Sequence, residues 1–133
     1  MRYMVEKGKV EALISNEMIA FQRAQLGRGA ESAKTYIKDD MIVVRLQGVL
    51  TAAEKQLAQQ DKGKALIKEM RYQLEEIIRP KLEILIEEII GIRVISLHND
   101  ISTKTGERID VIILESKIDF EYMTINPNKT TII

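Results

Sequence analysis

Apolar residues recur every three or four positions from about Glu6 to Leu26, which is the spacing of one face of a helix. The members of this face are Val10, Leu13, Ile14, Met18, Phe21 and Ala24. We expect Gly27 to end the helix, because glycine readily adopts the left-handed conformation of a helix C-cap. The next stretch, "SAKTYIKDDMIVVRLQGV", places β-branched and aromatic residues on either side of a polar turn at Lys38-Asp39-Asp40. This pattern predicts two strands joined by a tight turn.

A second helical region begins after Thr51. Thr51 and Glu54 have the spacing of a capping box, in which each side chain accepts a hydrogen bond from the other residue's free backbone N–H. Asp61 and Gly63 indicate a break or a new helix start, and the helical pattern then runs to Ile90. Pro80 interrupts it, and a proline inside a helix removes one hydrogen bond and kinks the axis.

The apolar positions around Pro80 fall on two stripes of the predicted helix when they are placed at ~100° per residue. The first stripe comprises Leu66, Ile67, Met70, Leu74, Ile77 and Ile84, and the second comprises Ile78, Leu82, Leu85, Ile86, Ile89 and Ile90. Because one stripe packs on one surface, two stripes predict that residues 77–90 are sandwiched between the sheet and either the first helix or a second copy of the chain. The predicted interface residues are Ile77, Leu82, Ile84, Leu85 and Ile89.

Two further strands follow Gly91, in "IRVISLHNDIS" and "GERIDVIILES", with Gly106 in the turn between them. The last stretch, 117–133, alternates briefly at Phe120, Tyr122 and Thr124, a pattern compatible with an edge strand. We therefore expect an α+β fold in the order helix, two strands, long Pro-kinked helix, two strands. It forms one domain over 1–133, with two layers in which helices cover one face of a four-stranded, mainly antiparallel sheet.

Composition narrows the classes of function. The chain has 133 residues, 45% apolar and 30% charged, which is typical of a globular domain with a sizeable core. Twenty Lys and Arg balance twenty Asp and Glu, which argues against a nucleic-acid partner, because such proteins usually carry a basic surplus. Cysteine is absent, which excludes disulfides, thiol nucleophiles and iron–sulfur ligation. No stretch is long and apolar enough for a signal peptide or a membrane span, so we expect a cytoplasmic location.

Catalytic chemistry has little support in the sequence. His98 is the only histidine, whereas zinc sites, serine triads and di-iron sites need more than one, or a histidine with a cysteine. Asp100, Glu107 and Asp110 leave an oxygen-ligated magnesium or calcium site open, although loop aspartates usually bond their own backbone. We interpret Arg71 with Glu75, and Glu75 with Arg79, as surface i,i+4 pairs. We expect no metal, no cofactor and no enzymatic activity.

Two short stretches could bind an anion. Gly27, Arg28 and Gly29 offer backbone N–H groups and a guanidinium, although a helix cap is the favoured interpretation. The loop between the last two strands combines hydroxyl and basic side chains, at Ser102, Thr103, Lys104, Thr105 and Arg108. That composition suits a phosphate or carboxylate ligand, but a solvated hairpin loop needs the same residues.

Three segments, "GRGAES", "VVRLQGVLTAAEKQLA" and "RPKLEILIEEIIGIRVISLHNDISTKTGERIDVIIL", together resemble the MpsC-like family, a bacterial family once described as a domain of unknown function. The resemblance covers about 10–114 and leaves 117–133 as a C-terminal extension. The matching positions are Gly27, Gly29, Leu50, Thr51, Glu54, Pro80, Gly91, Asp100, Ser102, Thr105, Gly106 and Glu107, while Ala30 and His98 depart from the pattern. The resemblance implies a component of a Na⁺-translocating, membrane-potential-generating system linked to inorganic-carbon supply. It also implies an antiporter-type membrane partner and a large second partner, and it supplies no catalytic residues.

These observations favour a non-enzymatic, cytosolic accessory or regulatory protein. We expect a homodimer that docks on a membrane-associated ion-translocating complex. The alternative is a small anion- or nucleotide-binding sensor that uses the GRG turn and the 100–108 loop. A third hypothesis is an enzyme with an oxygen-ligated metal.

Overall fold

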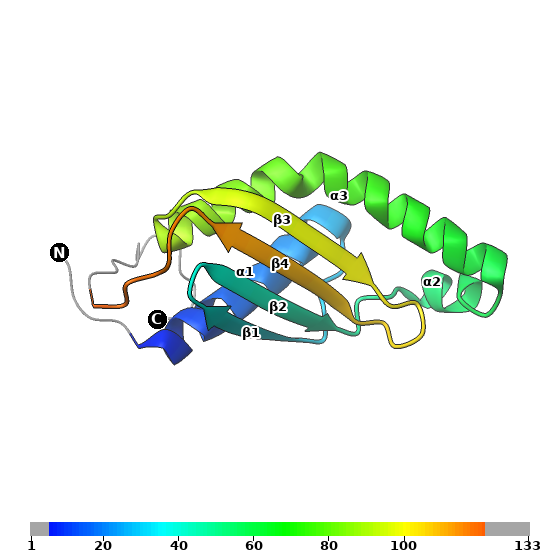
Figure 1. The fold of residues 1–133 in the computed structure, drawn as a ribbon. Coiled ribbons are helices and arrows are strands. Elements are labelled where there is room, and N and C mark those ends of the chain that lie inside the picture. The colour runs from blue at the N-terminus through cyan, green and yellow to red at the C-terminus, as the bar shows by residue number, and fades with distance from the viewer. Residues whose placement is uncertain (1–5, 122–133) are drawn as a thin grey trace.

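The computed structural model describes residues 6–121. Its elements are α1 (Lys7–Leu26), β1 (Ser32–Lys38), β2 (Met41–Gln47), α2 (Ala52–Leu57), α3 (Asp61–Ile90), β3 (Val94–Ile101) and β4 (Arg108–Leu114). The strands form one antiparallel sheet in the order β1-β2-β4-β3. In Figure 1, α1 lies behind the sheet, whereas α3 runs along the β3 side and its C-terminal end passes behind β3. The predicted α+β fold, with its order of helices and strands, is confirmed.

The predicted element ends are also confirmed. Gly27 and Gly91 follow α1 and α3 in the left-handed conformation, with φ of 79° and 76°, and their N–H groups donate to carbonyls of the last helical turn. The β1–β2 turn is formed by Asp39 and Asp40, where Asp39 has a φ of 54°. The short turn allows the two strands to pair along their whole length.

Helix α2 begins with the predicted capping box. The Glu54 N–H donates to the Thr51 hydroxyl at 3.1 Å, and the Thr51 N–H donates to the Glu54 carboxylate at 2.9 Å. Helix α3 starts only three residues after α2 ends, and Gly63 lies in its first turn. A Cβ at this position would lie 1.8 Å from the carbonyl oxygen of Leu57, so only glycine permits this close approach of the two helices.

Helix α3 continues through Pro80 and changes direction along its length (Figure 1). The second predicted stripe is covered by its own chain, because Leu82 and Ile89 are fully buried and Leu85 packs against the core. The predicted role of Leu82 and Ile89 in an interface is therefore wrong. Ile77 and Ile84 of the first stripe are 69% and 56% exposed, so the predicted sandwich around residues 77–90 is not formed within the described chain.

The core lies between the sheet and the two long helices. Alternate residues of each strand point into it, and the helices contribute one face each. Its fully buried members include Val10, Ile14 and Met18 of α1, Ile42, Val44, Leu46 and Ile112 of the sheet, and Ile67, Leu82, Ile86 and Ile89 of α3. After β4 the chain packs Ile118 against this core without forming a strand up to residue 121. The predicted alternation at Tyr122 and Thr124 lies outside the described residues.

The two outer strands have backbone N–H groups that are occupied by helix side chains. On β1, the Ile37 N–H donates to the carboxylate of Glu11 from α1 at 2.8 Å. On β3, the Val94 N–H donates to the carboxylate of Glu87 from α3 at 2.7 Å. Each long helix therefore occupies one N–H group of an edge strand as well as covering the inner face of the sheet.

Candidate functional site

The charged residues of α3 that face the core form buried ion pairs with other elements. Arg71 donates to both carboxylate oxygens of Glu54 on α2, at 2.8 and 2.6 Å, and to the Val49 carbonyl at 2.9 Å. Arg108 on β4 donates to Glu75 and, at 2.8 Å, to Asp110. The interpretation of Arg71 and Glu75 as a surface pair is therefore wrong. These contacts instead hold α3 against α2 and the sheet.

Glu54 has a perturbed acidity that follows from these contacts. Burial raises the pKa of its carboxyl, but the hydrogen bonds from Arg71 and Thr51 and the attraction of Arg71 outweigh burial, and the pKa lies below its ordinary value. Glu54 is therefore ionised at neutral pH, and its charge is compensated by Arg71. This arrangement is structural, because the carboxylate is buried among its partners.

The residues predicted to bind an anion are brought near one another but are not all available. Arg108 is buried with Glu75 and Asp110 and cannot reach a ligand at the surface, so its predicted ligand role is wrong. Arg28 donates to the Gly48 carbonyl at 3.2 Å and lies 3.6 Å from Glu31. Gly27 is the C-cap of α1, as described above, and Gly29 packs against Ile19 of α1. The GRG turn is thus a helix end that is tied to β2.

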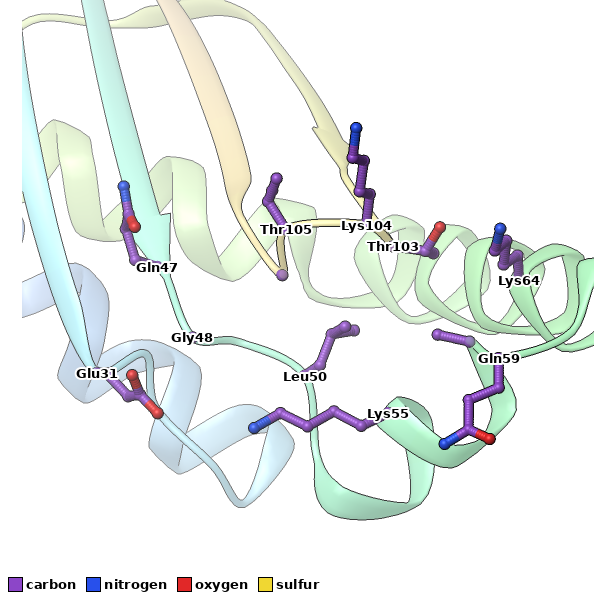
Figure 2. Close-up of a pocket in the computed structure, with 12 residues that line it drawn as sticks. Glu31, Gln47, Gly48, Leu50, Lys55, Gln59, Lys64, Thr103, Lys104 and Thr105 are labelled. Carbon is purple, nitrogen blue, oxygen red and sulfur yellow. The ribbon is translucent and has the colours of Figure 1, made fainter.

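The loop between β3 and β4 is stabilised by its own hydroxyl groups. The Ser102 hydroxyl accepts the Thr105 N–H at 3.1 Å, and the Thr105 hydroxyl accepts the Glu107 N–H at 3.2 Å. Thr103 and Lys104 take no part in these two hydrogen bonds. They line a cleft between this loop, α2 and the end of β2 (Figure 2).

This cleft has a volume of about 690 Å³ and is lined by three lysines and a single glutamate, Lys55, Lys64, Lys104 and Glu31. Leu50 forms its floor, and the Lys55 side chain extends across it toward Glu31 in Figure 2. The Lys104 amine points away from Leu50 and lies at the rim. The arrangement favours a negatively charged ligand, but the lysine amines do not converge on one point.

The three carboxylates considered for a metal lie apart, and each has a cationic partner. Asp110 is buried with Arg108, Glu107 is 2.7 Å from Arg45, and Asp100 is 3.1 Å from Lys68. The Ile101 N–H lowers the pKa of Asp100, against the effect of burial, and Lys68 lowers it further. Residues 6–121 contain no group of three side chains placed to hold a metal ion.

The face of the sheet opposite the helices is a surface that the sequence analysis missed. We call it the outer sheet face, and cross-strand register arranges it in three rows. These rows are Lys34, Arg45, Ile109 and Asp100; then Tyr36, Val43, Val111 and His98; then Lys38, Met41, Ile113 and Ser96. Within residues 6–121 no helix or strand covers it (Figure 1).

A sequence signal for this face was present in β2 and β4. "MIVV" and "VIIL" have apolar residues at consecutive positions, so both faces of these strands are apolar. Strands of this kind are typical of sheets that are covered on both sides. The signal was not used because the same residues also satisfy a simple strand pattern.

A second exposed apolar surface runs along α3. We call it the α3 outer stripe, and it comprises Leu66, Met70, Ile77 and Ile84. Met70, Ile77 and Ile84 are seven residues apart, and each follows a glutamate, at Glu69, Glu76 and Glu83. The stripe is thus bordered on one side by an acidic row, as on a helix that packs against a partner helix.

Comparison with known proteins shows which proteins this chain is related to. A family model described as Na⁺-translocating membrane potential-generating system (MpsC) matches residues 6–116. The chain belongs to the MpsC family. It is 41% identical over 108 residues to the uncharacterized protein YbcI of Bacillus subtilis strain 168, a match that covers 81% of this chain and 87% of YbcI.

A second relative, the uncharacterized protein YrhF of the same organism, is 27% identical over 106 residues, with 78% of this chain and 87% of YrhF covered. No solved structure matches the chain. None of the helices in residues 6–121 has the length and apolar content needed to cross a membrane. The MpsC match extends the predicted family region slightly at both ends.

Proposed function

We propose that this MpsC-family protein is a non-enzymatic, cytosolic accessory component of a Na⁺-translocating, membrane-potential-generating system, and that it works by docking on a partner. The observation that carries the proposal is the α3 outer stripe. Four large apolar side chains are exposed along one helix, whereas the remaining apolar face of the same helix is buried. Exposed apolar side chains that recur along one helix face are typical of a protein interaction site.

The chemistry of the stripe indicates what kind of partner it fits. Its seven-residue spacing suits an amphipathic helix, whose apolar side chains pack between Met70, Ile77 and Ile84. The acidic row at Glu69, Glu76 and Glu83 favours a basic border on that partner helix. The family description supports placing this partner in an ion-translocating system.

The proposal is tested with Ile84→Glu. We expect this variant to lose co-purification with the ion-translocating membrane component from the native host, because a charge in the centre of the stripe opposes apolar packing and adds to the acidic row. Its melting temperature should be unchanged, since Ile84 is 56% exposed.

The matched control is Tyr72→Glu, which places the same charge at an exposed position of α3 outside the stripe. Tyr72→Glu should retain the membrane component. Equal retention by both variants would contradict a role for the stripe.

A second candidate function is an anion- or nucleotide-binding sensor, which the lysine-lined cleft favours. Thr103, Lys104 and Thr105, which the sequence indicated, share this cleft with Lys55 and Lys64. The candidate therefore shifts from the GRG turn and Arg108 to α2 and the start of α3.

Thermal unfolding with inorganic phosphate, pyrophosphate and ATP tests this candidate. A ligand that binds only the folded chain raises its melting temperature by mass action. We expect a concentration-dependent increase that Lys55→Ala removes and that Lys38→Ala, at an exposed lysine outside the cleft, retains. An unchanged melting temperature with all three anions would reject the sensor.

A further inference from the structure

We infer that the outer sheet face binds a second copy of this chain, with a twofold axis that runs parallel to the strands between β2 and β4. This surface is distinct from the docking surface proposed above, because it lies on the sheet and not on the α3 outer stripe. The chemistry of the three rows favours a second copy of the chain on this face.

The centre of the outer sheet face is apolar. Met41 and Val43 of β2 lie beside Ile113 and Val111 of β4, and all four are partly exposed within the described chain. Ile109 is also exposed, next to Arg45. A sheet that leaves such a centre in water loses the free energy that burial would provide, about 25 cal/mol per Å² of apolar surface. A second apolar sheet face would cover it.

The borders of the face are complementary to each other. β1 presents Lys34 and Lys38 at one border, and β3 presents Asp100 at the other, where Lys68 of α3 lies 3.1 Å from the Asp100 carboxylate. Lys34 and Asp100 belong to the same row, through Arg45 and Ile109. Lys34 therefore lies at the same height along the strands as a carboxylate that is 80% exposed and shares its charge with Lys68.

This arrangement selects one of the two simple face-to-face dimers. A twofold axis parallel to the strands places β1 of each copy over β3 of the other, so that Lys34 faces Asp100 twice. It also places Val43 over Val111 and Met41 over Ile113. An axis perpendicular to the strands would instead place β1 over β1 and bring four lysines together, which is unfavourable. Charge complementarity favours the parallel axis.

Other modes of association are less accessible. Strand addition at an edge needs free backbone N–H and C=O groups, but Glu11 occupies the Ile37 N–H on β1 and Glu87 occupies the Val94 N–H on β3. The inner face of the sheet is filled by α1 and α3. One N–H group on each edge strand is therefore already occupied, whereas the outer sheet face is uncovered within residues 6–121.

The size of the face predicts the strength of the dimer. Four strands about 4.8 Å apart and five residues at about 3.4 Å give a footprint of roughly 19 by 17 Å. This is small for a specific interface, so we expect dissociation at concentrations on the order of 1 μM to 100 μM. Two sheets packed in this way lie about 10 Å apart, with strand directions within about 30°.

Sedimentation velocity over a range of concentrations tests the inference. We expect the wild-type chain to form a dimer and Val43→Glu to weaken the dimer at least tenfold, because Val43 lies in the apolar centre. Ile84→Glu should dimerise like the wild type, since it lies on α3. A wild type that stays monomeric across the range would overturn the inference, as would a dimer that Ile84→Glu breaks and Val43→Glu does not.

The axis is tested with two exposed border variants, which also serve if Val43→Glu does not fold. Lys34→Asp and Asp100→Lys should each weaken the dimer several-fold, and the double variant should recover most of the loss, because residue 34 of one copy faces residue 100 of the other. A double variant that is weaker than both single variants would overturn the parallel axis. These dimerisation measurements do not depend on partner capture. The dimer can therefore be ruled out while the docking function holds, and the docking function can be ruled out while the dimer holds.

Discussion

At the scale of single residues, Glu54 shows how one carboxylate connects local and long-range structure. Its contact with Thr51 could be predicted, because a capping box depends only on residues three apart. Its contact with Arg71 could not, because it requires α3 to fold back on α2. The Glu54 side chain thus caps the N-terminus of α2 and also binds Arg71 of α3.

Glu54→Gln should make the free energy of unfolding depend less on pH in the acidic range. The folded-state pKa of Glu54 lies below its ordinary value of 4.5, so its contribution is present above pH 4.5 and is lost as pH falls through the lowered pKa. At pH 7 we expect the variant to be less stable by about 2–4 kcal/mol, since Arg71 loses its partner. The difference from wild type should shrink below pH 4.5.

Chemical denaturation at several pH values measures this effect. Glu69→Gln is the control, because Glu69 is exposed on α3 and its replacement should change stability by less than about 0.5 kcal/mol. A constant difference between Glu54→Gln and wild type from pH 7 to pH 3 would contradict the assigned role of the carboxylate.

Arg71 and Glu75 were misplaced because an i,i+4 pair of opposite charge looks the same on a surface and in a core. The available signal was their position on the helix. Ile67, Arg71, Glu75, Ile78 and Leu82 follow one another at intervals of three or four, so the charged pair lies on the same stripe as the buried apolar residues. Charges on such a stripe need partners from other elements.

At the scale of elements, the junction of α2 and α3 depends on a single missing side chain. Gly63→Ala should reduce the free energy of unfolding by about 1–3 kcal/mol, because the added Cβ would overlap the Leu57 carbonyl and force the helices apart. Gly8→Ala is the control, since a Cβ at Gly8 of α1 meets nothing within 4 Å. It should be neutral or stabilising by about 1 kcal/mol. A Gly63→Ala variant as stable as wild type would show that the two helices adjust freely.

The sequence showed the two apolar stripes of α3, but it did not show which of them is buried. Periodicity assigns residues to faces and does not say which face meets the sheet. In the structure the stripe of Ile78, Leu82 and Ile86 lies on the core, and that of Ile77 and Ile84 is exposed. The choice depends on the direction from which α3 crosses the sheet, which no local pattern contains.

At the scale of the whole molecule, the order of helices and strands followed from local signals, whereas the strand order did not. The last strand, β4, lies between β2 and β3, so its neighbours come from both halves of the chain. Pairing of this kind is decided by the fit of complete faces. It also produces the cleft, because the β3–β4 loop then lies beside α2.

The two proposed surfaces lie on different elements, the sheet and α3, and are compatible. A dimer through the outer sheet face leaves the α3 outer stripe of each copy exposed. The assembly would therefore present two equivalent docking sites, and a partner with two helices could bind both with increased avidity. The variants Val43→Glu and Ile84→Glu separate the contributions of dimerisation and docking.

The carboxylates of Glu11 and Glu87 also affect how copies of the chain can associate. A sheet with an exposed apolar face and unpaired edge strands can add further copies of the chain without limit and form fibrils. Here the hydrogen bonds to Ile37 and Val94 occupy one backbone N–H group on each edge strand of the described sheet. In the proposed face-to-face dimer each copy would cover the apolar sheet face of the other, so the pair would leave no such face exposed to a third copy.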